Sequence, residues 1–353
     1  MRSSSCSRST ALYSVKIVAI ETSCDETAVA VVDAAGDSVH VKSNVISSQI
    51  ALHAPYGGVV PALAAREHAA NIQHVFETAM TEAGVTMGDI DLIAVTRGPG
   101  LGPALLVGLT FARALAWKHD TPIVGVNHMD GHVHSNWLDR DGLPQFPALN
   151  LIVSGGHTEL VLMKSHTDYE VIGETRDDAV GEAFDKAARL LDLGYPGGPA
   201  ISKLAIQGNP VAYPLPRPMA HSGDYDFSYS GLKTAVLYLV RDLGTLTDQQ
   251  RADIAASFQE AALDVLIAKT RHAARELGVR SLLLSGGVSA NALLRERITA
   301  LGAELGIPTF IPELKYTTDN AAMIAAAGYF AAQKETTEHL DWRSVVMDAN
   351  LSF

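Results

Sequence analysis

Two histidines four positions apart are the residues in this sequence whose spacing most directly indicates chemistry. His128 and His132 frame the segment His-Met-Asp-Gly-His. Residues four apart on a helix share one face, so both imidazoles can reach one metal ion. Asp319 is a candidate third ligand, and two imidazoles with one carboxylate leave coordination positions open for a substrate. The spacing equally permits histidines that only fill the surface or core, and that alternative stays open.

A zinc protease is disfavoured by the residue that follows the first histidine. The protease motif needs a glutamate there as general base. Met129 occupies that place in this chain. The two cysteines, Cys6 and Cys24, are too few for a disulfide framework and cannot form a CxxC zinc site. We therefore expect a reducing compartment, the cytoplasm.

Two aspartates lie where a carboxylate could act on a substrate. Asp25 follows an apolar run and precedes another, at the tip of an expected hairpin. It could accept a proton or bind metal, and the alternative is an Asx-type turn residue. Asp185 lies in Glu-Ala-Phe-Asp-Lys and could accept a hydrogen bond from a ribose hydroxyl. Its alternative is a place on a solvated helix face.

Two Ser-Gly-Gly turns, at residues 154–156 and 285–287, follow apolar strands and could hold phosphate. Glycine lets backbone N–H groups approach an anion closely, and the second turn also opens a helix. Neither a Walker A loop nor an uninterrupted dinucleotide fingerprint is present, since prolines break the Gly-rich segment 98–102. These turns favour a nucleotide cleft, while ordinary tight turns remain the alternative.

The elements that must position these residues alternate between strands and helices, which indicates an α/β fold. Strands are expected at 15–20, 28–32, 91–96, 122–126, 149–153, 160–163 and 281–284. Helices are expected at 62–83, 104–119, 182–191, 231–243, 248–277, from 292 onward and at 320–333. Residues 15–32 and 149–163 share the layout of strand, polar turn and strand, which indicates a duplicated unit. Residues 210–230 are expected to form a long surface loop.

Composition and charge limit the class of protein further. The chain has 353 residues, 47% hydrophobic and 19% charged, which is typical of a globular protein of about two domains. No apolar stretch is long enough for a membrane span. Lys and Arg number 27 against 39 Asp and Glu, a net charge of −12. Such a protein needs a local basic patch or a partner to hold nucleic acid.

The first 14 residues have a composition unlike the rest. They are rich in serine, with Arg2 and Arg8 and no acidic residue. We expect residues 1–14 to form a disordered leader. A short organellar presequence is the minor alternative, and the apolar core of a secretory signal is missing.

Several segments, in their order along the chain, resemble one family. They are residues 20–27, 97–100, 128–132, 153–158, 181–186, 195–199, 226–234, 285–291 and 318–323. Together they are similar to the bacterial form of the tRNA N6-adenosine threonylcarbamoyltransferases (TsaD), in the actin/hexokinase/Hsp70-like ATPase superfamily. The resemblance implies a two-lobed fold with duplicated ribonuclease-H-like domains. We expect lobes at 15–135 and 136–353, with the last helix able to return to the N-terminal lobe.

The resemblance also implies a reaction and its site. The enzyme is expected to transfer threonylcarbamoyl from threonylcarbamoyl-adenylate to the exocyclic amine of adenosine 37 in tRNAs reading ANN codons, releasing AMP. His128, His132 and Asp319 are expected to bind one divalent metal, Fe2+ before Zn2+, and Asp25 to be the catalytic carboxylate. The residues expected to hold the adenylate are Val153, Ser154, Gly155, Gly156, His157, Asp185, Gly198 and Asn291.

Expected partners are tRNA together with TsaB and TsaE, or a second copy of the chain in a homodimer. Two departures from the family pattern stand beside the metal ligands: Asn127 replaces a common histidine, and Thr317 replaces a usual cysteine. On the residues alone, a small-molecule kinase or ATPase of the same superfamily stays open. A non-catalytic scaffold is disfavoured, because it would need none of the metal ligands or Asp25.

Overall fold

The structure is a computed structural model that describes residues 14–334 and 340–353; residues 1–13 of the expected leader lie outside the described residues. Its first sheet has the strand order β3-β2-β1-β4-β5. These strands are β1 (Val15–Glu21), β2 (Glu26–Ala35), β3 (Ser38–Ser48), β4 (Leu92–Gly98) and β5 (Ile123–Asn127). Strands β1, β2 and β3 pair antiparallel, whereas β4 and β5 run parallel to β1.

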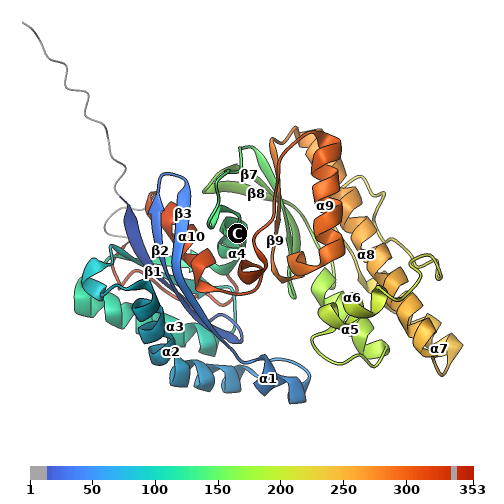
Figure 1. The fold of residues 1–353 in the computed structure, drawn as a ribbon, viewed down its shortest axis with the longest axis horizontal. Helices are drawn as coiled ribbons and strands as arrows, with labels where there is room; N and C mark the ends of the chain where they lie inside the picture. Colours follow the sequence, from blue (N-terminus) through green and yellow to red (C-terminus); the bar gives the residue numbers. More distant parts are fainter. Residues whose placement is uncertain (1–13, 335–339) are drawn as a thin grey trace, which may run out of the picture.

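The second sheet repeats this topology. Its strand order is β10-β9-β6-β7-β8, with β6, β7 and β8 antiparallel and β9 and β10 parallel to β6. The strands are β6 (Ala148–Val153), β7 (Thr158–Ser165), β8 (Asp168–Glu174), β9 (Ser281–Ser285) and β10 (Thr309–Phe310). The duplicated unit predicted from the two hairpins is therefore confirmed, and Figure 1 shows the two halves side by side.

Helices cover both sheets. They are α1 (Ile50–His53), α2 (Pro61–Ala83), α3 (Gly102–His119), α4 (His128–His134), α5 (Val180–Leu190), α6 (Gly197–Ala205), α7 (Ser230–Leu243), α8 (Asp248–Leu277), α9 (Ala292–Leu305) and α10 (Ala321–Ala332). The predicted helices match these to within a few residues. Within the described part of the chain, every helix is too short or too polar to cross a bilayer.

Helix α10 belongs spatially to the first sheet although it is the last helix among the described residues. It packs against β1, β2, β4 and β5. A Cβ at Gly328 would lie 2.6 Å from the Cβ of Ala94, so glycine allows this close approach. One hydrophobic cluster joins α10 to side chains of both sheets, among them Val126 and Ile152. The return of the last helix thus has a physical basis, and the boundary at 135–136 remains our proposal.

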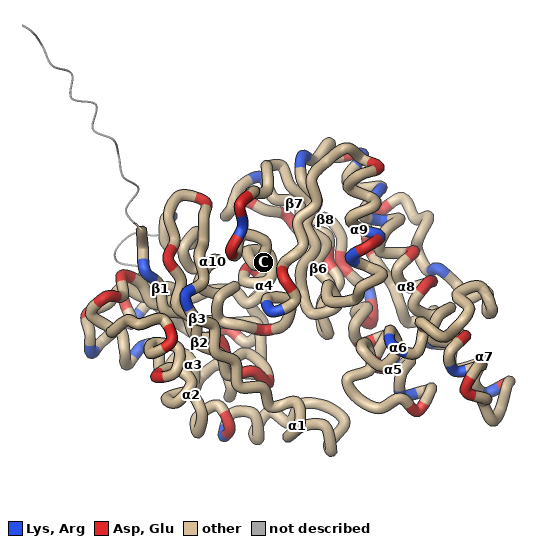
Figure 2. The backbone as a smooth tube through the Cα atoms, viewed as in Figure 1, with Lys and Arg blue, Asp and Glu red and all other residues tan. Residues whose placement is uncertain are grey.

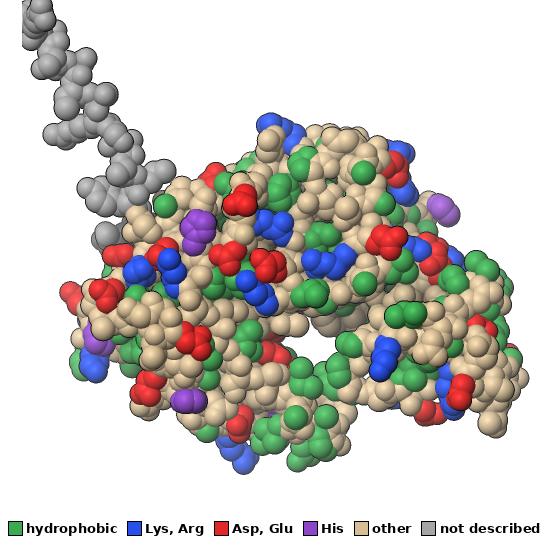
Figure 3. Space-filling view, in the orientation of Figure 1, with side chains coloured by type: hydrophobic (Ala, Val, Ile, Leu, Met, Phe, Trp, Pro, Cys, Tyr) green, Lys and Arg blue, Asp and Glu red, His purple; other side chains and the backbone are tan. Residues whose placement is uncertain are grey.

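Charged residues are spread over both halves. Figure 2 shows Lys and Arg interspersed with Asp and Glu on the helices and loops that cover the sheets. Figure 3 shows an opening between the half that carries α1 and the half that carries α5 and α6.

Candidate metal and nucleotide site

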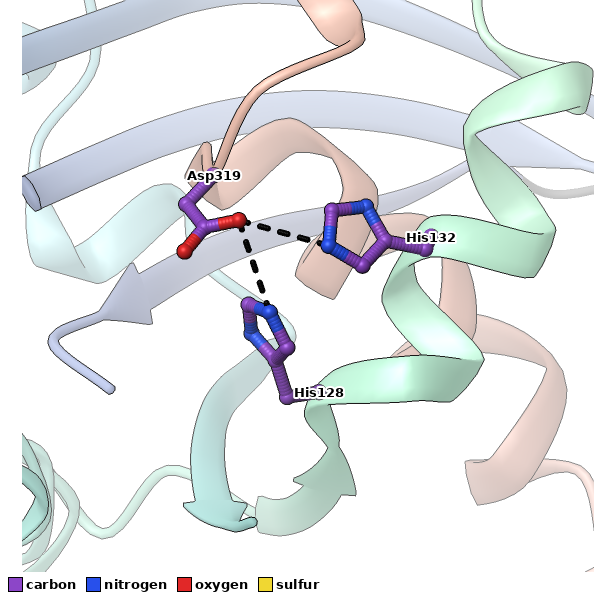
Figure 4. Close-up of side chains that lie close together, drawn as sticks. All are labelled: His128, His132 and Asp319. Carbon is purple, nitrogen blue, oxygen red and sulfur yellow. Dashed lines mark ion pairs between the residues drawn. The ribbon is translucent and has the colours of Figure 1, made fainter. Parts of the chain in front are cut away.

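Two histidines and one aspartate converge at the carboxyl end of β5. Helix α4 begins there, because the Asn127 side chain caps it by accepting a hydrogen bond from the Met129 backbone N–H at 2.8 Å. His128 and His132 lie one turn apart, and Asp319 comes from the turn before α10 (Figure 4). The Asp319 Oδ1 atom lies 3.4 Å from His128 Nε2 and 3.3 Å from His132 Nε2.

This cluster has the composition and geometry of a metal site. One ligand atom from each of the three side chains lies within 4.8 Å of the others. Two imidazole nitrogens and one carboxylate oxygen suit Fe2+ and Zn2+ and leave positions open for a substrate. The buried His132 Nδ1 has no hydrogen-bond partner among the described residues, so His132 makes no competing contact through that atom. The residues present therefore fit a divalent cation.

The charges of the cluster stabilise one another. Burial opposes the negative charge of Asp319, yet the facing His128 and His132 hold the pKa of this carboxyl well below its usual range. Burial likewise opposes a charge on His128, but Asp319 and Glu21 raise the pKa of this imidazole well above its usual value. A cation in the site would replace the proton that these carboxylates otherwise attract.

The tip of the first hairpin lies beside this cluster. Asp25 is half-buried between β1 and β2, and its carbonyl accepts a hydrogen bond from the Gln49 backbone N–H at 2.9 Å. Burial, followed by the charges of Asp319 and Asp25, raises the pKa of Glu26 to about 9. The carboxyl of Glu26, next to Asp25 at the tip, is therefore within electrostatic reach of the metal ligand Asp319.

A pocket of about 890 Å³ contains half of the residues expected to hold the adenylate. Gly155, Asp185, Gly198 and Asn291 line it. Asp185 Oδ1 accepts the Gly197 N–H at 2.7 Å, at the start of α6, and burial raises the pKa of this carboxyl. The remaining expected residues, Val153, Ser154, Gly156 and His157, do not line this pocket.

Asn291 has structural contacts that the sequence did not predict. Its Oδ1 caps α9 by accepting the Leu294 N–H at 2.9 Å. Its Nδ2 donates to Ser202 Oγ at 2.9 Å and to Gln259 Oε1 at 2.8 Å. These bonds fix the amide at the pocket wall, between α6, α8 and α9.

The turn at residues 154–157 lies between this pocket and the metal cluster. The Ser154 Oγ accepts the His157 N–H at 3.0 Å, so the turn is held by its own hydrogen bonds. Burial, and then the nearby charges of His128 and His132, lower the pKa of His157 to about 4. The first turn of α5 packs closely here, because a Cβ at Gly181 would lie 2.4 Å from the Ser154 carbonyl oxygen.

A second, acidic pocket of about 590 Å³ lies on the other side of His157. Its lining includes Glu159, Glu174 and the C-terminal residues 349–353. Glu159 and Glu174 are directly opposed on β7 and β8. Burial and then the Glu174 charge raise the pKa of Glu159 to about 7, and its buried Oε2 has no partner among the described residues.

Replacing Glu159 by glutamine is expected to stabilise the protein at pH 8 and not at pH 4. The folded-state pKa of about 7 exceeds the ordinary value of 4.5. The stability that the protonated carboxyl contributes is therefore present below pH 4.5 and is lost as the pH rises through 7. Calorimetry should show a higher melting temperature for the variant at pH 8 alone. The exposed Glu170→Gln is the control, and equal shifts at both pH values would contradict this explanation.

Glu21 is the main contributor that the sequence analysis did not identify. It ends β1, is fully buried, and its Oε2 lies 3.1 Å from His128 Nδ1. The local signal is a glutamate that ends an otherwise apolar strand run, since such a carboxylate needs a specific partner.

Comparisons with known proteins identify a family model and relatives similar to most of the chain. The family model "TsaD: tRNA N6-adenosine threonylcarbamoyltransferase" matches residues 40–326. The protein of that name from Symbiobacterium thermophilum is 53% identical over 330 residues, which cover 93% of this chain and 95% of that protein. The one from Moorella thermoacetica is 50% identical over 317 residues, covering 89% and 91%.

Solved structures show the same fold at low sequence identity. Full-length HypF in the phosphate- and nucleotide-bound form has a TM-score of 0.62 at 13% identity, covering 92% of this chain and 47% of that chain. The (R)-2-hydroxyglutaryl-CoA dehydratase component A of Acidaminococcus fermentans has a TM-score of 0.53 at 12% identity, covering 91% and 100%. These similarities, with the repeated sheets, confirm the actin/hexokinase/Hsp70-like fold.

Proposed function

The chain belongs to the tRNA N6-adenosine threonylcarbamoyltransferase family, and from this premise we propose how its site carries out the transfer. The activity is transfer of a threonylcarbamoyl group to the N6 amine of an adenosine in tRNA. Adenosine 37 of tRNAs reading ANN codons is the proposed acceptor, and threonylcarbamoyl-adenylate the proposed donor. A small-molecule kinase or ATPase is not favoured, because the relatives that match nearly the whole chain are transferases.

His128, His132 and Asp319 are the proposed ligands of one divalent cation, Fe2+ before Zn2+. The observation that supports this is the convergence of their three ligand atoms within 4.8 Å. A cation held by these three side chains would supply Lewis-acid chemistry to the bound donor. The three side chains hold their own geometry through the Asp319 carboxylate, which contacts both imidazoles.

Asp25 is the proposed general base. The exocyclic amine of adenine is a poor nucleophile, because its lone pair is delocalised into the ring. Acceptance of its proton as the new bond forms contributes roughly 10² to 10⁴-fold in rate. Asp25 lies half-exposed at a tip beside the metal cluster, where a splayed-out loop base could reach it. The donor is a mixed anhydride, and the AMP that leaves when the anhydride bond breaks is a good leaving group that needs no strong acid.

The larger pocket is the proposed site for the adenosine part of the donor. Asp185 offers a carboxylate for a ribose hydroxyl, and the fixed Asn291 amide also lines the pocket. The turn 154–157 leads from the pocket toward the metal ligands, so we assign Val153, Ser154, Gly156 and His157 to the reactive end of the donor. Gly155 and Gly198 line the pocket with backbone alone, which leaves space for the ligand.

Replacing Gly181 by alanine is expected to weaken AMP binding about tenfold, or about 1.4 kcal/mol. The new Cβ would lie 2.4 Å from the Ser154 carbonyl oxygen and 2.9 Å from the Gly155 Cα, so the turn must shift. Titration calorimetry with AMP measures the change. Gly142→Ala is the matched control, because a Cβ there meets nothing within 4 Å. AMP affinity equal to wild type in Gly181→Ala would place the nucleotide elsewhere.

Partners are part of the proposal. With a net charge of −12, the chain has little general affinity for a polyanion, which favours assistance in holding tRNA. TsaB and TsaE are the proposed partners, with a homodimer as the alternative, and the cytoplasm is the proposed location.

Reconstitution tests the function. The protein is incubated with tRNA, threonine, bicarbonate, ATP, the adenylate-forming synthase, TsaB and TsaE, and the tRNA nucleosides are analysed by mass spectrometry. We expect threonylcarbamoyl-adenosine at position 37. Unmodified adenosine, with partners shown to be active on a related enzyme, would contradict the proposal.

A further inference from the structure

Glu21 is a fully buried carboxylate whose partners all come from elements of the candidate site. Its Oε1 accepts a short hydrogen bond, 2.5 Å, from the Ser23 backbone N–H. Its Oε2 accepts one from the Thr96 hydroxyl and lies 3.1 Å from His128 Nδ1. Burying a carboxylate costs free energy unless hydrogen bonds and charge compensate for it. Three groups therefore direct hydrogen bonds at the Glu21 carboxylate, which indicates that it fixes the positions of those groups.

The sheet topology explains how these groups meet. Strands β1, β4 and β5 are adjacent and parallel, so their carboxyl ends lie at one edge of the first sheet. Glu21 ends β1, Thr96 lies near the end of β4, and His128 follows β5. Thr96 therefore stands between the other two and donates to the carboxylate that reaches across to the imidazole.

The direction of these hydrogen bonds determines the state of His128. A carboxylate only accepts, so the contact with Glu21 requires a proton on Nδ1. On the other side of the ring Nε2 faces Asp319 Oδ1 at 3.4 Å, and a bound cation would take the place of the proton on that nitrogen. A metal ligand needs this tautomer, and its other nitrogen is commonly held by a carboxylate.

The same carboxylate also fixes the hairpin tip. Glu21 holds the Ser23 N–H, while the Ser23 carbonyl accepts the Leu101 N–H at 2.8 Å. The Ser23 hydroxyl lies 3.2 Å from His128 Nδ1, on the imidazole that Glu21 holds. Asp25 is two residues farther along this tip. One buried side chain thus connects the segment that carries the proposed base to a proposed metal ligand.

We propose that Glu21 is a positioning residue that sets the His128 tautomer and holds the Asp25 tip in register with the metal ligands. The inference rests on the proposed metal site and goes beyond it, since neither the ligand set nor the base includes Glu21. Glutamine at this position has the same size but presents an NH2 group to one of the donors. His128 would then turn its Nδ1 lone pair to that amide and direct Nε2–H at the metal position.

Zinc binding to the metal-free full-length protein tests this inference. Competition titration with a chromogenic chelator should give about a 10- to 100-fold weaker Zn2+ affinity for Glu21→Gln. In the zinc-loaded protein, NMR of the histidine ring nitrogens should show His128 Nδ1–H hydrogen-bonded in wild type and absent in the variant. Thr96→Val is the second variant, and we expect a smaller loss of Zn2+ affinity than in Glu21→Gln. Thr96→Ser keeps a hydroxyl at this position and should bind Zn2+ with the wild-type affinity.

Asp130→Asn is the matched control, because Asp130 lies on the same helix but accepts its hydrogen bond from the Tyr169 hydroxyl. It should bind Zn2+ within about twofold of wild type. Wild-type affinity and an unchanged Nδ1–H signal in Glu21→Gln would overturn the inference and leave the proposed metal site standing. A wild-type protein that binds no Zn2+ at the three ligands would overturn both.

Discussion

Replacing Asp25 by asparagine is expected to abolish threonylcarbamoyl transfer while leaving the protein folded and its metal affinity intact. Asparagine has nearly the same size but cannot accept a proton from the attacking amine. Loss of a positioned general base lowers the rate by roughly 10² to 10⁴-fold. Asp25 is half-buried in the turn between β1 and β2, and we expect the fold to tolerate the loss of its charge.

Single-turnover kinetics with purified threonylcarbamoyl-adenylate and tRNA measure this effect directly, because they exclude donor synthesis. Asp141→Asn is the control, since Asp141 is an exposed aspartate outside the site. Calorimetry and metal analysis of the same samples show whether the variant is intact. A rate within threefold of wild type in Asp25→Asn would remove Asp25 from the reaction.

Replacing His132 by alanine is expected to remove the bound metal and the activity with little loss of stability in the metal-free protein. His132 contributes Nε2 to the cluster, and its Nδ1 has no partner among the described residues. The buried imidazole therefore has no Nδ1 hydrogen bond to another described residue to lose. Elemental analysis should find less than about a tenth of the wild-type metal, since one of the three proposed protein ligands is gone.

His134, on the same helix, is the matched control. Its replacement by alanine is expected to lower stability and to leave metal binding intact. Its Nδ1 lies 2.8 Å from the Asp130 carbonyl and its Nε2 lies 3.1 Å from the His166 carbonyl. Its ring also packs against Trp137 and Phe330. His134→Ala should lower the melting temperature and keep the metal at low temperature. Full metal occupancy in His132→Ala, or metal loss in a folded His134→Ala, would contradict the assignment.

The sequence predicts most of the framework, and the exceptions have physical reasons. The apolar runs of β1, β2, β6 and β9 are buried strands, so composition alone identifies them. Strands β3 and β8 are partly exposed and rich in polar residues, which hides their periodicity. Helix α6 begins with Gly-Gly-Pro, a sequence typical of a loop, and only tertiary packing reveals it.

The site is predictable where its signal is local. The spacing of His128 and His132 predicts one helix face, and α4 presents both side chains to the same point. Asp319 is far away in the sequence, so spacing could not place it, and only the family resemblance indicated it as more than a candidate. Glu21 was missed because its role depends on contacts with Thr96 of β4 and with His128, which follows β5, and both are far from it in the sequence.

Anomalous diffraction from crystals of the metal-loaded protein with a non-reactive analogue of the adenylate tests the central claim most directly. The account predicts a metal peak bound by His128, His132 and Asp319. It also predicts adenosine in the pocket beside Asp185 and the carbamoyl end of the analogue near Asp25. A metal bound elsewhere, or an analogue whose carbamoyl end lies remote from both the metal and Asp25, would contradict the account.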